Sequence, residues 1–190
     1  VERTRFRPLA SGQLRARNAI VFLVIELALA ALLLFFLSPF TRLTAVCVLP
    51  LVFIYPFCKR FTHWPQAVLG AAFNWGMLMA WAQVSGSIPA GAVVMWIGAI
   101  AWQIGYDTVY AYVDVADDTR LGLKSTAILF GRSGKACVAL FYTITLVSWA
   151  VGGWTLGMSM PYAIGMVTIG AHLAWQAWRV DLKRPELNFQ

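Results

Sequence analysis

Four aspartates lie within twelve residues, directly after a long apolar run, in the segment 106–126 that reads YDTVYAYVDVADDTRLGLKST. If a helix continues through this segment, Asp107, Asp114 and Asp118 share one stripe and Asp117 falls further round. Carboxylates spaced i,i+4 repel each other, and the partial negative charge at the end of a helix disfavours them further. A hard divalent cation such as Mg²⁺ would relieve this repulsion, because it binds one or two carboxylates and fills its other positions with water and phosphate oxygens.

Basic residues follow the aspartates at Arg120 and Lys124, and they would suit a diphosphate bound beside such a cation. The alternative interpretation of the same residues is an acidic turn in water, whose charge Arg120 and Lys124 balance. The alignment of three carboxylates with the end of an apolar helix favours the metal site, and the spacing alone leaves both interpretations open.

The elements that position these aspartates are apolar. Of the 190 residues, 60% are hydrophobic and 12% are charged, and the mean hydropathy is +0.69. Soluble domains carry about twice that share of charge, so the composition indicates an integral membrane protein. Apolar runs that approach the roughly 20 residues of a bilayer-crossing helix occur at 18–37, 43–57, 65–83, 89–106, 136–157 and 161–178. They do not alternate as strands do, so the predicted fold is an all-α, multi-pass transmembrane bundle within a single domain, 1–190.

The distribution of basic residues indicates the orientation of the bundle. Fourteen of the fifteen Lys and Arg residues fall in alternate links between the apolar runs, and only Arg42 lies in an opposite link. By the positive-inside rule the basic side, which also carries the aspartates, is cytoplasmic or faces the mitochondrial matrix. We therefore expect a bacterial or mitochondrial inner membrane protein. The net charge of +7 is explained by this pattern, so nucleic acid is excluded as a partner.

The aspartate segment resembles the second aspartate-rich motif of the UbiA-type prenyltransferases, a family of membrane enzymes. The matching positions are Asp107-x-x-Tyr110-Ala111-x-x-Asp114-x-x-Asp117-Asp118, followed by Gly122-Leu123-Lys124-Ser125-Thr126. Segment 55–76 resembles the branch of the family that acts on 4-hydroxybenzoate, through Tyr55-Pro56-x-x-Lys59-Arg60-Phe61-Thr62 and Phe73-Asn74-Trp75-Gly76. Segment 3–12 resembles the stretch that follows the family's first aspartate-rich motif.

The resemblance implies transfer of a polyprenyl group from polyprenyl diphosphate to an aromatic acid, 4-hydroxybenzoate, at the carbon ortho to its hydroxyl, in ubiquinone biosynthesis. It implies Mg²⁺ as cofactor, with Asp114, Asp118 and Asp117 as ligands, and it makes Asp107 catalytic together with Asp114 and Asp118. The remaining residues expected to bind a substrate are Arg5, Arg7, Lys59, Arg60, Asn74, Tyr110 and Lys124. The basic ones have an alternative as ordinary positive-inside charges. Asn74 could instead bridge helices, and Tyr110 could pack in the core.

The family's first motif, Asn-Asp-x-x-Asp-x-x-x-Asp, would lie upstream of Val1, and about six of the family's nine helices are readable here. We therefore expect a chain truncated at both ends that is inactive by itself. Two other functions stay open. One is a prenyltransferase of the same fold with another acceptor, such as a naphthoate or a porphyrin. The other is a membrane transporter or subunit whose aspartates bind a coupling cation.

Overall fold

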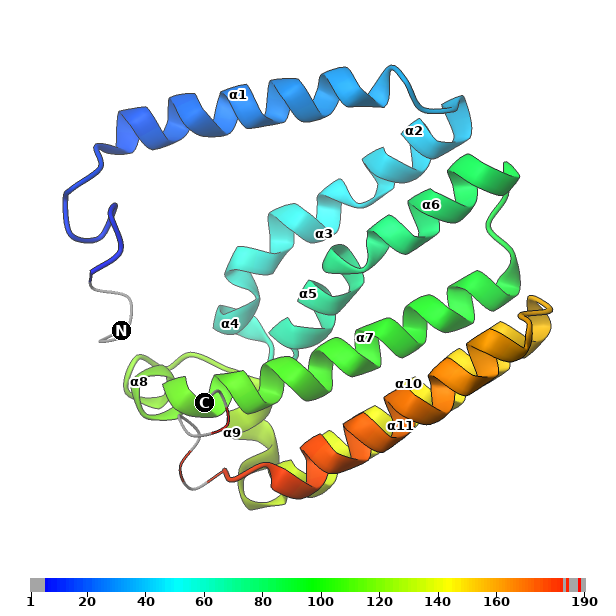
Figure 1. The fold of residues 1–190 in the computed structure, drawn as a ribbon. Coiled ribbons are helices and arrows are strands. Elements are labelled where there is room, and N and C mark those ends of the chain that lie inside the picture. Colours follow the sequence, from blue (N-terminus) through cyan, green and yellow to red (C-terminus); the bar gives the residue numbers. More distant parts are fainter. Residues whose placement is uncertain (1–5, 183, 185–187, 189–190) are drawn as a thin grey trace.

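The computed structural model describes residues 6–182, 184 and 188, and within them the chain is helical without a strand (Figure 1). The α-helices are α1 (Ala16–Leu34), α2 (Pro39–Cys47), α3 (Leu49–Ile54), α4 (Cys58–Phe61), α5 (Pro65–Phe73), α6 (Trp75–Ser85), α7 (Ala90–Ala111), α8 (Val115–Arg120), α9 (Thr126–Phe130), α10 (Gly134–Thr155) and α11 (Met160–Arg179). Three short 3-10 turns join some of them: η2 (Tyr55–Phe57), η3 (Tyr112–Asp114) and η4 (Gly131–Ser133).

Several of these helices follow one another without a break, so the described residues form six long helical segments, in agreement with the six apolar runs of the sequence. Five are long and apolar enough to cross a membrane: Ala16–Leu34, Pro39–Phe61, Pro65–Ser85, Ala90–Arg120 and Thr126–Thr155. The sixth segment, α11, has 20 residues but a more polar composition. These segments confirm the predicted all-α bundle and fit an integral membrane protein.

The segment Pro39–Phe61 is longer than its apolar run. The sequence suggested a short crossing at 43–57, whereas the helical segment has 23 residues. Pro50 and Pro56 lie near the starts of α3 and η2, where a proline is tolerated because the first residues of a helical turn need no backbone donor. The prolines therefore divide this segment into successive helices without ending it, and they carry the chain on to Lys59.

The packing centre of the bundle is the pair α7 and α10, which run side by side along their length (Figure 1). Gly91, Gly98 and Gly105 lie seven residues apart on α7, and all three face α10. An added Cβ at Gly98 would lie 2.7 Å from Cδ1 of Trp149, and one at Gly105 would lie 2.6 Å from Cε1 of Tyr142. Small residues at a regular spacing let two membrane helices approach closely, which here fixes α7 against α10.

The other segments pack around this centre. Helix α5 contacts α7, α2 contacts α6, and α11 contacts α10. No residue of α1 is buried, and α1 lies apart from α7 in Figure 1. At one end of the bundle α4, α8 and α9 gather near the C-terminal end of α7, and residues 6–15 lie at the same end (Figure 1). The helices that carry the predicted aspartates and Lys59 therefore lie at one end of the molecule.

Candidate active site

The aspartates are distributed over three successive elements. Asp107 lies in α7, Asp114 ends the turn η3, and Asp117 and Asp118 lie in the first turn of α8. The sequence-based geometry assumed a regular helix throughout, but a 3-10 turn advances about 120° per residue where an α-helix advances about 100°. Three residues of η3 therefore rotate the later aspartates by roughly 60° relative to Asp107, so the single stripe of the sequence analysis is only approximate.

The turn η3 is held in place by Tyr112. Its hydroxyl donates a hydrogen bond to the carbonyl oxygen of Gly131, at 2.6 Å. The Tyr112 ring lies where a side chain at position 134 would be, so Gly134 is needed for this close approach. A long-range contact thus fixes the point where α7 changes into α8, and with it the position of Asp114.

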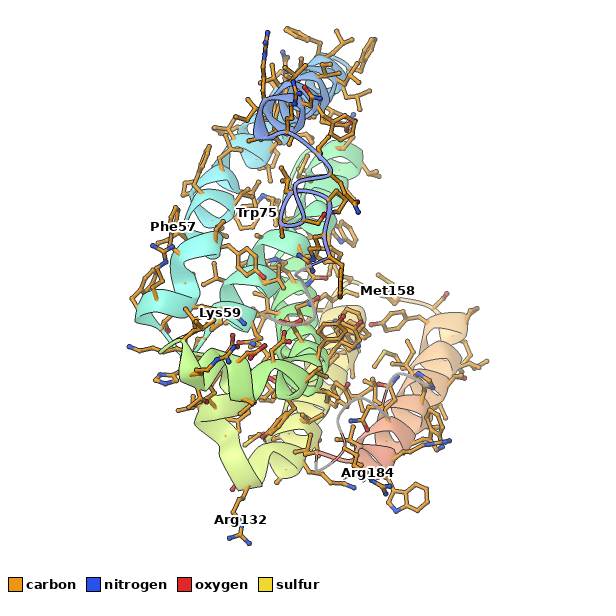
Figure 2. All side chains as sticks on the ribbon, turned by 90° about the vertical axis from the view of Figure 1, so that its left-hand side faces the viewer. Phe57, Lys59, Trp75, Arg132, Met158 and Arg184 are labelled. Carbon is orange, nitrogen blue, oxygen red and sulfur yellow. The ribbon has the colours of Figure 1, made fainter. Side chains whose placement is uncertain are left out.

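Asp118 is the most buried of the four carboxylates, with 1% of its surface exposed. Its Oδ2 accepts a hydrogen bond from Nζ of Lys59 at 2.7 Å. Lys59 comes from α4 and reaches toward the segment that contains α7 and α8 (Figure 2). A buried carboxylate is stable only when a charge or several donors compensate it, so this ion pair explains how Asp118 is accommodated.

Asp107 and Asp114 complete the acidic group. Asp107 interacts electrostatically with Lys59 and with Asp114, and Tyr55 interacts with Asp107 in the same way. The structure therefore places the predicted residues Lys59, Asp107, Asp114 and Asp118 together. It adds Tyr55, which the sequence analysis noted within a motif and did not assign to the site. Its spacing of four residues before Lys59, on consecutive helical turns, is the signal that could have identified it.

Lys124 joins the site through the backbone. The amide of Lys124 donates to the carbonyl oxygen of Lys59 at 2.8 Å, and its ammonium donates to the carbonyl oxygen of Phe61 at 3.2 Å. The chain can turn back toward α4 because Gly122 has φ of +66°, a conformation that a glycine adopts without strain. The amides of Gly122 and Leu123 bond to the carbonyls of Thr119 and Asp118, which closes the end of α8 as a Schellman motif.

A buried network of polar side chains links the helices α5, α7 and α9 next to the site. The hydroxyls of Thr108 and Thr126 are 2.5 Å apart, and the amide of Thr126 donates to Oε1 of Gln66 at 3.3 Å. Thr108, Thr126 and Gln66 are almost fully buried and come from α7, α9 and α5. Since a buried polar group without a partner is costly, these bonds fix the three helices relative to one another.

The other predicted residues lie at different places. Arg5 lies outside the described residues. Arg7 is exposed in the turn before α1, and Arg60 is exposed with its guanidinium 5.8 Å from the centre of the Phe57 ring. Tyr110 is at the surface of α7, with 36% of its area exposed. Asp117 pairs with Arg120 at 3.0 Å on the outside of α8.

Asn74 lies at the junction of α5 and α6. Its Nδ2 donates to the carbonyl oxygens of Gly70, at 2.9 Å, and of Ala99, at 3.4 Å. The amide therefore links α5 with α7, which is one of the two roles that the sequence left open. Contact with the acceptor stays a prediction.

The donor set of the site is made of oxygen atoms and fits Mg²⁺. No group of three or more His, Cys, Asp or Glu residues within the described part of the chain is arranged to hold a metal alone. Mg²⁺ does not require such a group, because it binds by one or two carboxylates together with water and phosphate oxygens. Asp114 and Asp118 match this need, and Lys59 and Lys124 supply positive charge on the same side.

Comparisons with known proteins identify the family of the chain. The sequence profile described as the UbiA prenyltransferase family matches residues 1–190. The chain is 41% identical over 186 residues to the mitochondrial 4-hydroxybenzoate polyprenyltransferase of Drosophila melanogaster, covering 97% of this chain and 47% of that protein. It is 42% identical over 176 residues to the 4-hydroxybenzoate octaprenyltransferase of Citrobacter koseri, covering 93% and 61%. The chain thus spans about half to three fifths of the length of these relatives. No solved structure matches it.

Proposed function

The chain belongs to the UbiA prenyltransferase family, and we propose that the protein transfers a polyprenyl group from polyprenyl diphosphate to 4-hydroxybenzoate. The new bond forms at the ring carbon ortho to the hydroxyl, as a step of ubiquinone biosynthesis. The names of the relatives support this acceptor, since those from the fly, from Citrobacter koseri and from Bos taurus are all 4-hydroxybenzoate prenyltransferases. The observation that carries the proposal is the group of Lys59, Asp107, Asp114 and Asp118 at one end of a membrane bundle.

In the proposed mechanism the diphosphate lies against the lysines. Lys59 and Lys124 bind its oxygens, and Arg7 and Arg60 attract it to this end of the bundle. Asp114 and Asp118 would hold Mg²⁺, which when bound neutralises the diphosphate and makes it a better leaving group. Asp117, predicted from the sequence as a third ligand, pairs instead with Arg120 on the outside of α8. The carboxylate of Asp107 adds negative charge, which attracts both the ammonium of Lys59 and a bound Mg²⁺.

The bond that breaks joins the allylic carbon to the diphosphate oxygen, and the electron pair leaves with the diphosphate. The face of the Tyr110 ring stabilises the allylic cation by a cation–π interaction. The acceptor ring supplies the electron pair of the new carbon–carbon bond. Transfer of the ring proton to the released diphosphate then restores the aromaticity of the ring. Because the long prenyl group is apolar, it stays in the bilayer beside the helices.

This site faces the cytoplasm or the mitochondrial matrix in our proposal. Fourteen of the fifteen Lys and Arg residues lie in the links on the side of the aspartates. A naphthoate or a porphyrin is a less favoured acceptor, since the relatives reported above are 4-hydroxybenzoate enzymes. The family membership also disfavours a transporter.

The test is an assay of the full-length protein in lipid nanodiscs with Mg²⁺, a polyprenyl diphosphate and a panel of acceptors. We expect product from 4-hydroxybenzoate and none from a naphthoate or a porphyrin. Asp114→Asn should lower kcat by roughly a hundredfold or more, which is what a positioned electrostatic group contributes. Transfer to a naphthoate alone would overturn the acceptor, and full activity of Asp114→Asn would overturn the metal assignment.

A further inference from the structure

A cavity lies where α10 begins and α11 ends. It has a volume of about 790 Å³, and its wall includes Tyr112, Gly131, Arg132, Lys135, Arg179 and Asp181. This volume lies within the roughly 300–1,000 Å³ of small-molecule sites. None of the residues in the proposed mechanism lines it. The cavity is therefore a separate site, although Tyr112 connects its wall to the turn η3.

The charge of the cavity is positive. The wall contains three basic side chains, those of Arg132, Lys135 and Arg179, and one acidic side chain, that of Asp181. The carboxylate of Asp181 pairs with Arg184, at 3.5 Å. In Figure 2 the side chain of Arg132 extends outward from its element. Three cations around one cavity indicate an anionic ligand.

Lys135 and Arg179 are held in defined positions. The ammonium of Lys135 donates to the carbonyl oxygens of Trp178, at 2.6 Å, and Val180, at 3.2 Å, at the C-terminal end of α11. An ammonium has three donors, so one is left after these two bonds to described residues. The guanidinium of Arg179 lies 5.4 Å from the centre of the Trp175 ring, and it donates no hydrogen bond to the described residues. Its N–H groups are thus available to a phosphate.

The surface next to the cavity is apolar. Helix α11 buries only Leu173, and it exposes Ile164, Val167, Trp175 and Trp178. Trp175 and Trp178 lie next to the basic Arg179 at the end of α11, an arrangement typical of residues at the depth of the lipid head groups. A ligand at this place can put a phosphate into the cavity and lay its hydrocarbon chains along α11.

We propose that the cavity between the start of α10 and the end of α11 binds the phosphate of an anionic phospholipid. Arg179, Arg132 and the remaining donor of Lys135 hold the phosphate, and α11 receives the acyl chains. Basic pockets between membrane helices on the cytoplasmic or matrix side suit this ligand. The bound lipid would also brace Tyr112, whose hydroxyl is bonded to Gly131 in the cavity wall. The proposal does not depend on the enzymatic activity.

The experiment measures lipid retention on the purified full-length protein by native mass spectrometry, after exchange from nanodiscs that contain equal amounts of phosphatidylglycerol and phosphatidylcholine. We expect selective retention of phosphatidylglycerol. Each of Arg179→Gln and Arg132→Gln should weaken it roughly fivefold, and the double variant roughly 25-fold. Arg179→Lys should keep most of the binding. The control Arg17→Gln removes an exposed cation from α1 at the same end of the bundle and should change nothing.

Two further arms distinguish the source of the phosphate and guard against misfolding. Inorganic phosphate added at millimolar concentration should not displace the lipid. If it does so and stabilises the lipid-free protein equally, the cavity is a site for a soluble anion and the proposal is wrong. Size-exclusion profiles and thermal unfolding in phosphatidylcholine identify a variant that fails to fold. Retention by a folded Arg132→Gln/Arg179→Gln variant equal to that of the parent would also overturn the proposal.

Discussion

The ammonium of Lys59 and the carboxylate of Asp118 lie 2.7 Å apart, although 59 residues separate them in the sequence. The pair joins the end of the segment Pro39–Phe61 to the end of the segment Ala90–Arg120. Asp118 is buried while 37% of the Lys59 side chain is exposed, so the lysine is the side of the pair that a diphosphate can approach. This asymmetry leads to the first test.

We expect Lys59→Met to lower both stability and activity. It leaves the buried carboxylate of Asp118 without its ammonium, which costs about 1–3 kcal/mol of unfolding free energy. Asp118→Asn in the same background removes the uncompensated charge, so the double variant Lys59→Met/Asp118→Asn should regain most of the lost stability. Thermal unfolding followed by tryptophan fluorescence measures this recovery.

Activity separates the two roles of Asp118. If Asp118 also holds the Mg²⁺–diphosphate complex, the double variant stays inactive although it is stable again. Recovery of turnover together with stability would show that Asp118 only compensates Lys59, and the metal assignment would have to exclude it.

The sequence predicted the helical segments well and the internal arrangement of the site less well. Long apolar runs depend on composition, which one sequence shows directly. The pairing of Lys59 with Asp118 depends on how two helices meet, and no local pattern reports that. The turn η3 could not be predicted from the local sequence either, because Tyr112 stabilises it through a hydrogen bond to Gly131, 19 residues away.

Lys124 and Arg120 form a natural comparison, because both follow the aspartates and only Lys124 is bonded to the α4 segment. We expect Lys124→Met to raise the KM for the polyprenyl diphosphate roughly tenfold, the worth of one hydrogen bond to a charged group. Arg120→Gln removes only an exposed pair with Asp117 and should change KM by less than about twofold. Steady-state kinetics with varied diphosphate test both.

Lys124→Arg serves as the conservative variant and should restore most of the affinity. A fall in kcat at unchanged KM in Lys124→Met would argue that the lysine acts by holding the loop, and diphosphate binding by Lys124 would then be rejected.

Asn74→Ala addresses a residue for which the sequence left two roles open. Its amide bonds to Gly70 and Ala99 connect α5 with α7, and such bonds between membrane helices contribute about 0.5–2 kcal/mol. We expect Asn74→Ala to lower the unfolding free energy by this amount and to leave the KM for 4-hydroxybenzoate unchanged. A higher KM at unchanged stability would instead assign Asn74 to the acceptor.

The close contact of α7 with α10 gives the sharpest test of the fold. A Cβ at Gly98 would lie 2.7 Å from Cδ1 of Trp149 and 2.8 Å from Cβ of Ser148. Cβ of Ser148 is fixed by the backbone of α10, and Cδ1 of Trp149 can move only if the whole indole ring moves. This ring is held by a hydrogen bond that its Nε1 donates to the carbonyl oxygen of Met95, at 3.0 Å. We therefore expect Gly98→Ala to destabilise the protein by about 1–3 kcal/mol, as overpacked cores do.

Gly165→Ala is the matched control, since Gly165 is also inside a helix and an added Cβ meets nothing within 4 Å. Alanine is the better helix former by about 1 kcal/mol, so this variant should be as stable as the parent or slightly more stable. Unfolding in a mixed detergent series gives both values on one scale. Because α7 carries Asp107 and leads into η3, Gly98→Ala should also lower turnover, whereas Gly165→Ala should not. Equal stability of the two variants would mean that α7 and α10 do not approach as closely as the spacing of Gly91, Gly98 and Gly105 requires.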